Sequence, residues 1–113
     1  MECYPLPDVA TMLGVPFPKV RQYVRDHRLL SMSNDEGITC VPAPFLRKVD
    51  DGFELVDDVA GTAIILMDGG FSQEEACLWM ISEQDLLKGD VPIEVIRNGG
   101  YHRVNRVASM MAF

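Results

Sequence analysis

Apolar residues near the start of the chain recur at helical spacing, and a turn rich in glycine and proline interrupts them. Val9, Ala10 and Leu13 predict the inner face of a first helix. We expect Asp8 to cap this helix and Gly14 to end it, because glycine takes a left-handed cap at no steric cost. The pattern predicts a short helix followed by a tight turn.

The next segment predicts a second helix over residues 18–28, opened by Pro18, which lacks an N–H that a first helical turn does not need. Val20, Val24 and His27 share its inner face, at spacings of four and three, so His27 is interpreted as a packed side chain. Cations and one amide point away from that face: Lys19, Arg21, Gln22, Arg25 and Arg28. A helix that packs by one side and offers cations on the other suits the major groove of DNA.

Two extended segments follow, over residues 29–33 and 38–41, and the second is β-branched and stopped by Pro42. The sequence Asn34-Asp35-Glu36-Gly37 between them is a turn by composition. Helix, turn, helix and hairpin in this order predict a winged helix-turn-helix.

The rest of the chain predicts a C-terminal bundle of short helices, so the expected fold class is mainly α with a small β-hairpin wing. Residues 44–49 read as a short helix or turn, and the polar break Asp50-Asp51-Gly52 is the expected internal boundary. It divides a winged helix-turn-helix, residues 1–49, from a helical subdomain packed on it, residues 50–113.

Glycine, proline and a capping box delimit the helices of this second half. A helix over residues 55–68 is expected to stop at Gly69-Gly70, and Ser72 with Glu75 forms a capping box for the next one. A short helix over residues 92–97 precedes the last helix. The inner face of the last helix is predicted to hold Val104, Val107, Ala108, Met111 and Phe113, and Trp79 and Phe71 are expected in the core.

Charge is distributed unevenly in a chain whose net charge is −7. Residues 1–48 hold six Lys or Arg against five Asp or Glu, whereas residues 49–113 hold four against twelve. Such a molecule is expected to bind DNA by one face, with modest affinity and a strong loss on adding salt. We predict DNA contacts from Lys19, Arg21, Gln22, Arg25, Arg28, Arg47 and Lys48.

Other classes of function find little support in the sequence. Cys3, Cys40 and Cys77 form no CxxC pair and are interpreted as buried or idle thiols, and no zinc spacing is present. No nucleophile–base pair, phosphate loop or dinucleotide fingerprint is present, so we expect neither an enzyme nor a cofactor. No apolar run of membrane-spanning length and no signal-peptide pattern occurs, and a cytoplasmic protein is expected.

The chain resembles the actinobacterial winged helix-turn-helix DNA-binding proteins whose mycobacterial member is a Ser/Thr protein kinase substrate. The matching pieces are Leu13-Gly14-Val15-Pro16 with Lys19-Val20, Ile65-Leu66 with Asp68-Gly69-Gly70, Trp79, Arg106-Val107, and Tyr4 to Leu6 with Val9 and Ala10. The resemblance implies a winged helix-turn-helix followed by a helical C-terminal part, and a DNA-binding role. From the uneven charge and the hairpin we expect a small protein that binds double-stranded DNA as a transcription regulator or nucleoid-associated protein, with the helix over residues 18–28 in the major groove.

Two features depart from this family. Its phosphorylated threonine lies in a tail before the matching segment, and Thr11, inside the expected first helix, does not correspond to it. The wing of the family is basic, whereas the turn here carries Asp35 and Glu36, which phosphates would repel.

A looser resemblance points to another class of function. Trp79, Gly89, Pro92-Ile93, Ile96, Gly99-Gly100 and Val104 are similar to the toxin-binding domain of Xre/MbcA/ParS-type antitoxins. This similarity implies a helical module that binds a protein partner or a second copy of itself, and it defines the alternative function, a protein-interaction module built on the acidic C-terminal half.

Overall fold

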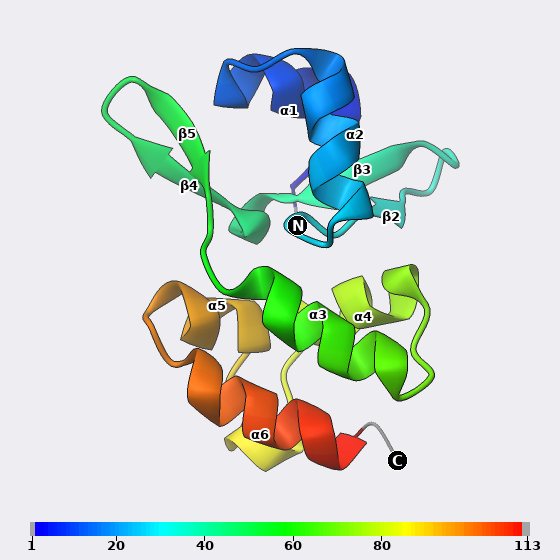
Figure 1. Ribbon diagram of the computed structural model, residues 1–113, viewed down its shortest axis with the longest axis vertical. Helices are drawn as coiled ribbons and strands as arrows, with labels where there is room; N and C mark the ends of the chain where they lie inside the picture. Colours follow the sequence, from blue (N-terminus) through cyan, green and yellow to red (C-terminus); the bar gives the residue numbers. More distant parts are fainter. Residues whose placement is uncertain (1, 112–113) are drawn as a thin grey trace.

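The computed structural model describes residues 2–111, and its N-terminal half folds around a three-stranded antiparallel sheet (Figure 1). The strands stand in the order β1-β3-β2, with bounds Cys3–Pro5 for β1, Met32–Ser33 for β2 and Thr39–Pro42 for β3. The helices α1 (Leu6–Leu13) and α2 (Phe17–Arg25) pack against each other, and α1 contacts β1 and β3. The predicted winged helix-turn-helix is confirmed.

The first helix begins earlier than the sequence pattern predicted. Pro5 is its N-cap and Pro7 lies in its first turn, so the prediction of Asp8 as the cap is wrong and Asp8 sits within the first turn. A carboxylate there still faces the positive end of the helix dipole. Gly14 ends the helix in the left-handed conformation, with a φ of 68°, as predicted.

The second helix ends at Arg25, three residues before the predicted end. Asp26 is its C-cap and His27 adopts a left-handed backbone, with a φ of 62°, so His27 does not continue the face of Val20 and Val24. The chain reverses here because the N–H of Arg28 donates to the carbonyl of Tyr23 at 2.8 Å. Val20 is fully buried and fixes which side of the helix faces outward.

The predicted wing is present, and a strand that the pattern missed completes its sheet. Met32 stands opposite Cys40 in the β2–β3 pair, and the side-chain oxygen of Asn34 accepts from the N–H groups of Glu36 and Ile38 in the turn. The strand β1 pairs with the other edge of β3. Three residues are too few to show an alternation, so no sequence signal marked β1.

A second hairpin replaces the helix or turn predicted over residues 44–49. The strands β4 (Leu46–Val49) and β5 (Gly52–Leu55) pair antiparallel after the 3₁₀ turn η1 (Ala43–Phe45), and Asp50 and Asp51 form their connection. The helix predicted to begin at residue 55 therefore begins only at Val59. Apolar runs this short fit the period of a helix and that of a strand equally well, so their spacing led to the wrong prediction. The predicted boundary at Asp50-Asp51-Gly52 coincides with this turn.

The C-terminal half is the predicted bundle of short helices (Figure 1). The bounds are Val59–Asp68 for α3, Gln73–Met80 for α4, Asp85–Leu87 for the 3₁₀ turn η2, Pro92–Arg97 for α5 and Tyr101–Met111 for α6. Helix α3 packs against α4 and α6. The capping box at the start of α4 is confirmed, because Ser72 and Glu75 exchange both of its hydrogen bonds. Phe113, predicted on the inner face of the last helix, lies outside the described residues. No helix in residues 2–111 is both long enough and apolar enough to cross a membrane.

One continuous core joins the two halves. It runs from Val9 and Val20 through Phe45 to Trp79 and Val104, and Trp79 is 7% exposed, as the sequence predicted. Phe71 is partly buried against it. At the edge of this core, the Gln73 amide accepts from the Ser31 N–H at 2.7 Å and donates to the Ser31 carbonyl at 2.8 Å. A side-chain amide on α4 thus satisfies both backbone groups of the residue just before β2.

Arg97 makes the second polar connection between the halves. Its guanidinium donates to the carbonyls of Pro44 and Leu46, each at 2.8 Å. Arg47 donates in return to the Arg97 carbonyl at 3.1 Å. These bonds hold α5 against the turn that leads into β4.

The cysteines differ from the prediction of three separate thiols. Cys77 is a buried free thiol, and burial, with Glu74 nearby, raises its pKa to about 12. Cys3 and Cys40 are joined as a disulfide between β1 and β3. No sequence signal marked this pair, because the two cysteines are separated by 37 positions and have no recognised spacing.

Replacing Arg97 with Met is expected to lower the free energy of unfolding by about 2 kcal/mol. Two carbonyls lose charge-assisted donors at a site where the side chain is 26% exposed. Thermal unfolding followed by circular dichroism should show a midpoint lower by about 8 °C. Arg106→Met is the matched control, since the Arg106 side chain is exposed and makes no hydrogen bond or ion pair within residues 2–111. Equal midpoints for the two variants would show that Arg97 does not connect the halves.

Candidate nucleic-acid interface

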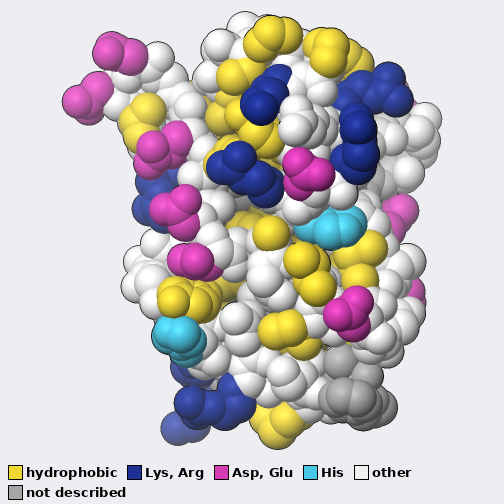
Figure 2. All heavy atoms as spheres, in the orientation of Figure 1, with side chains coloured by type: hydrophobic (Ala, Val, Ile, Leu, Met, Phe, Trp, Pro, Cys, Tyr) yellow, Lys and Arg dark blue, Asp and Glu magenta, His cyan; other side chains and the backbone are white. Residues whose placement is uncertain are grey.

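The exposed side of α2 and the turn after it carry the predicted polar contacts. Val20 is buried, so the opposite side of the helix faces solvent. The exposed residues include every predicted contact of this segment, namely Lys19, Arg21, Gln22, Arg25 and Arg28. Figure 2 shows Lys and Arg side chains gathered over α2 and the following turn, with an acidic side chain among them.

No carboxylate within residues 2–111 forms an ion pair with these cations. The ion pairs within residues 2–111 involve Arg47, Arg97 and Arg103, and each is with an acid outside α2. We call the remaining group on and after α2 the basic surface; it consists of Lys19, Arg21, Arg25 and Arg28. Its charge is available to an external anion.

Tyr23 organises part of the basic surface. The Lys19 ammonium lies 5.4 Å from the centroid of the Tyr23 ring, and the Arg28 guanidinium lies 5.0 Å from it. Cation–π contacts of this length restrict two long side chains before any ligand arrives. Sequence reasoning missed Tyr23; its spacing of four residues from Lys19 on the helix was the available signal.

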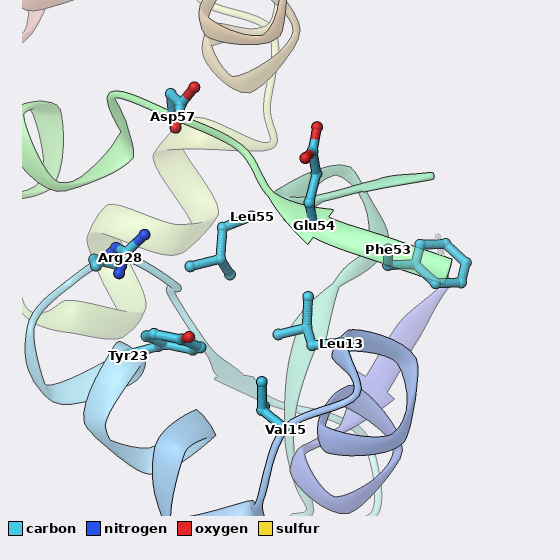
Figure 3. Close-up of a pocket in the computed structure, with 8 residues that line it drawn as sticks. All are labelled: Leu13, Val15, Tyr23, Arg28, Phe53, Glu54, Leu55 and Asp57. Atoms are coloured by element: carbon cyan, nitrogen blue, oxygen red, sulfur yellow. The ribbon is translucent and has the colours of Figure 1, made fainter. Parts of the chain in front are cut away.

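A hollow of about 330 Å³ lies beside this stack, between the helix-turn-helix and β5 (Figure 3). Leu13, Val15 and Leu55 point into it, Tyr23 and Arg28 form one wall, and Asp57 lies at its far end. Arg28 of the basic surface and Asp57, just before α3, therefore line the same hollow.

Arg47 and Lys48 form a group apart from the basic surface. Both lie on β4, which stands on the other side of α2 from β2 in Figure 1. Arg47 donates to the Arg97 carbonyl and lies 3.8 Å from Glu54, so its guanidinium is already engaged within the fold. Lys48 is exposed, two residues from the acidic turn of the β4–β5 hairpin.

The tip of the wing is acidic and exposed. Asp35 and Glu36 occupy the turn between β2 and β3, where Asn34 fixes the backbone and Gly37 takes a φ of 78°. The surface around α2 therefore combines a positive centre with a negative edge at the wing.

Other kinds of site are not apparent in this part of the chain. Within residues 2–111, no group of three or more His, Cys, Asp or Glu is placed to hold a metal ion. The acids Asp50, Asp51, Glu54, Asp57 and Asp58 are all exposed. His27 is partly buried at the base of the basic surface, beyond the end of α2. The arrangement favours electrostatic recognition of an extended anion.

Comparison with known proteins agrees with this architecture. Residues 1–46 match the family model described as the winged helix-turn-helix domain of DNA-binding protein Rv2175c, and residues 56–112 match the Rv2175c C-terminal domain of unknown function. The β4–β5 hairpin lies in the short interval between the two matches.

A relative, Rv2175c, matches nearly the whole chain both in sequence and in structure. DNA-binding protein Rv2175c of Mycobacterium tuberculosis is 27% identical over 121 residues, which cover 97% of this chain and 80% of that protein. The NMR structure of Rv2175c superposes with a TM-score of 0.79 at 28% identity, covering 99% of this chain and 82% of that one. With both halves matched in order and the fold shared throughout, this chain belongs to the Rv2175c family.

Proposed function

We propose that this protein binds double-stranded DNA by inserting α2 into the major groove, and that it acts in the cytoplasm as a transcription regulator or nucleoid-associated protein. The observation that carries the proposal is the basic surface, whose cations are exposed and form no ion pair within residues 2–111 of a chain whose net charge is −7. Membership in a family named for DNA binding supports the same conclusion.

The exposed side chains of α2 divide by reach and chemistry. Arg25 and Gln22 present groups that pair with base edges, guanidinium with guanine and amide with adenine. Lys19, Arg21 and Arg28 are assigned to phosphates, where point charges position the protein without reading sequence. Lys48 and Arg47 are proposed as flanking phosphate contacts, and Arg47 is the weaker of the two because Glu54 and the Arg97 carbonyl already hold it.

The acidic half does not prevent this mode of binding. Salt screens exposed charges beyond about 8–10 Å at moderate ionic strength, so distant carboxylates repel DNA less than the contacting cations attract it. The repulsion between these carboxylates and DNA grows when the salt concentration is lowered. The contacts between the cations and the phosphates weaken when it is raised. We therefore propose modest affinity with a steep dependence on salt.

The double variant Lys19→Ala/Arg25→Ala should bind a DNA duplex at least roughly tenfold more weakly than the parent near 0.1 M salt, because two phosphate or base contacts are removed. Gel-shift titrations at several salt concentrations measure both the affinity and its slope against salt. The magnitude of that slope should fall by about one, because Lys19 is assigned to a phosphate and Arg25 to a base edge.

The matched control is Lys88→Ala/Arg106→Ala, which removes the same charge from exposed positions in the C-terminal half. It should lose little affinity. If this control weakens binding as much as the α2 variant does, net charge rather than α2 governs the interaction. An α2 variant that binds like the parent would remove α2 from the interface.

The acidic wing yields a prediction with the opposite sign. Asp35→Asn/Glu36→Gln should bind DNA several-fold more tightly, since neutralising two carboxylates near the phosphates removes about 1 kcal/mol of repulsion. Asn34 is left in place, so the turn keeps its two side-chain hydrogen bonds. Fluorescence anisotropy with a labelled duplex gives the affinities.

Glu83→Gln/Asp85→Asn serves as the comparison, because both acids are exposed in the C-terminal half and the charge change is identical. A larger gain for the wing variant places the wing beside DNA. Equal gains would show that the wing has no local contact.

A second candidate function rests on apolar side chains that the C-terminal half leaves in solvent. Leu78, Leu86, Met110 and Met111 are 43%, 54%, 56% and 41% exposed. Leu86 and Met111 line a hollow between η2 and α6 that also includes Val107. Several large apolar side chains exposed together mark an interaction surface more often than a single exposed apolar residue does. We propose this region as the contact for a second copy or a protein partner.

Sedimentation equilibrium tests the self-association form of this candidate. The parent should show a mass above the 12.6 kDa of one chain as concentration rises, and Leu86→Lys should restore that single-chain mass. The control is Ile64→Lys, at an exposed position on α3, which should leave association unchanged. A single-chain mass for the parent at every concentration counts against the dimer.

A further inference from the structure

The Cys3–Cys40 pair lies within the sheet of the winged helix-turn-helix. Cys3 lies on β1 and Cys40 on β3, with their Cα atoms 5.5 Å apart, inside the range that a disulfide spans without backbone movement. The register sets Cys3 opposite Pro42 and Pro5 opposite Cys40, so the two cysteines are diagonal neighbours on adjacent strands. Strand pairing therefore holds the sulfurs together in either redox state.

The bond links the two ends of the proposed DNA-binding unit. The strand β1 runs directly into α1 through Pro5, and α1 packs on α2. The strand β3 is the returning strand of the wing. A covalent link between β1 and β3 thus fixes the helical corner relative to the wing.

The third cysteine is excluded from this chemistry. Cys77 is wholly buried on α4, and burial raises the pKa of its thiol to about 12, which suppresses the reactive thiolate. Cys40 is also wholly buried, whereas Cys3 is partly exposed. An oxidant from solvent meets Cys3 first, and Cys40 is the neighbour that resolves it.

We propose that Cys3 and Cys40 are a reversible redox modification site, whose closure stabilises the arrangement of helix corner and wing that binds DNA. The functional part of this inference rests on the proposed DNA binding; the modification itself does not. Disulfides do not persist where thiol reductants are abundant, as in the cytoplasm, so a pair placed at bonding distance there is open by default and closes on oxidation.

The chemistry balances with a peroxide as the oxidant. The Cys3 thiolate attacks one peroxide oxygen, forming an S–O bond as the O–O bond breaks, and water leaves after protonation. The Cys40 thiolate then attacks the Cys3 sulfur, forming the S–S bond as the S–O bond breaks, and a second water leaves. A dithiol reductant reverses the change by thiol–disulfide exchange and is itself oxidised.

Formation of the Cys3–Cys40 bond is expected to raise both the stability of the fold and its affinity for DNA. The bond closes a loop with a sequence separation of 37, which restricts the unfolded chain and should raise the unfolding midpoint by roughly 10 °C. Ordering β1 before DNA binds lowers the cost of association, so affinity should rise several-fold.

The experiment compares the full chain after treatment with hydrogen peroxide and after treatment with dithiothreitol. Mass spectrometry with thiol alkylation reports the bond, thermal unfolding reports stability, and fluorescence anisotropy with a DNA duplex reports affinity. Cys3→Ser should abolish all three responses, and Cys77→Ala should keep them. The reduced parent gives the open state without any substitution, should Cys3→Ser fold poorly.

Two results overturn the inference. One is peroxide-treated parent in which Cys3 and Cys40 both remain free to alkylation. The other is a bond that forms without changing the unfolding midpoint or DNA affinity. If the midpoint responds while neither state binds DNA, the proposed function fails and the modification site stands.

Discussion

The proposed function depends on four cations without carboxylate partners at one corner of an acidic molecule. Lys19, Arg21, Arg25 and Arg28 outline a helix whose other side is fixed by the buried Val20. Acids are plentiful elsewhere, and within residues 2–111 they pair with Arg47, Arg97 and Arg103. Because these four cations form no ion pair within residues 2–111, the fold concentrates attraction for an anion at a single surface.

The rest of the fold holds that surface in place. Gly14 turns the chain between α1 and α2, and β1 and β3 form the floor beneath α1. The core continues from this unit into the C-terminal bundle, and the Gln73 and Arg97 side chains join the halves at the backbone. The bundle thus supports the helix-turn-helix mechanically, while its exposed Leu86 and Met110 offer a surface for other contacts.

Sequence reasoning succeeded where one residue type dictates local structure and failed where distant segments meet. Glycine and proline placed the corner between α1 and α2, and the Ser72–Glu75 box placed the start of α4, because each acts within a few residues. Strand β1 and the Cys3–Cys40 bond depend on partners far along the chain, whereas the β4–β5 hairpin was missed because its short apolar runs fit the helical and the strand period alike. The exposure of the α2 cations followed from periodicity, and the spacing of four residues from Lys19 to Tyr23 was a usable signal for their contact, whereas the engagement of Arg47 by Arg97 is a tertiary contact that no spacing reveals.

The most direct measurement of the central claim is an NMR titration of the isotope-labelled protein with a short DNA duplex, following backbone amides. The account predicts that the largest shifts fall on residues 17–28 and on the wing turn, with the C-terminal helices little affected. Shifts concentrated on α4 and α6, with α2 unchanged at saturation, would contradict it.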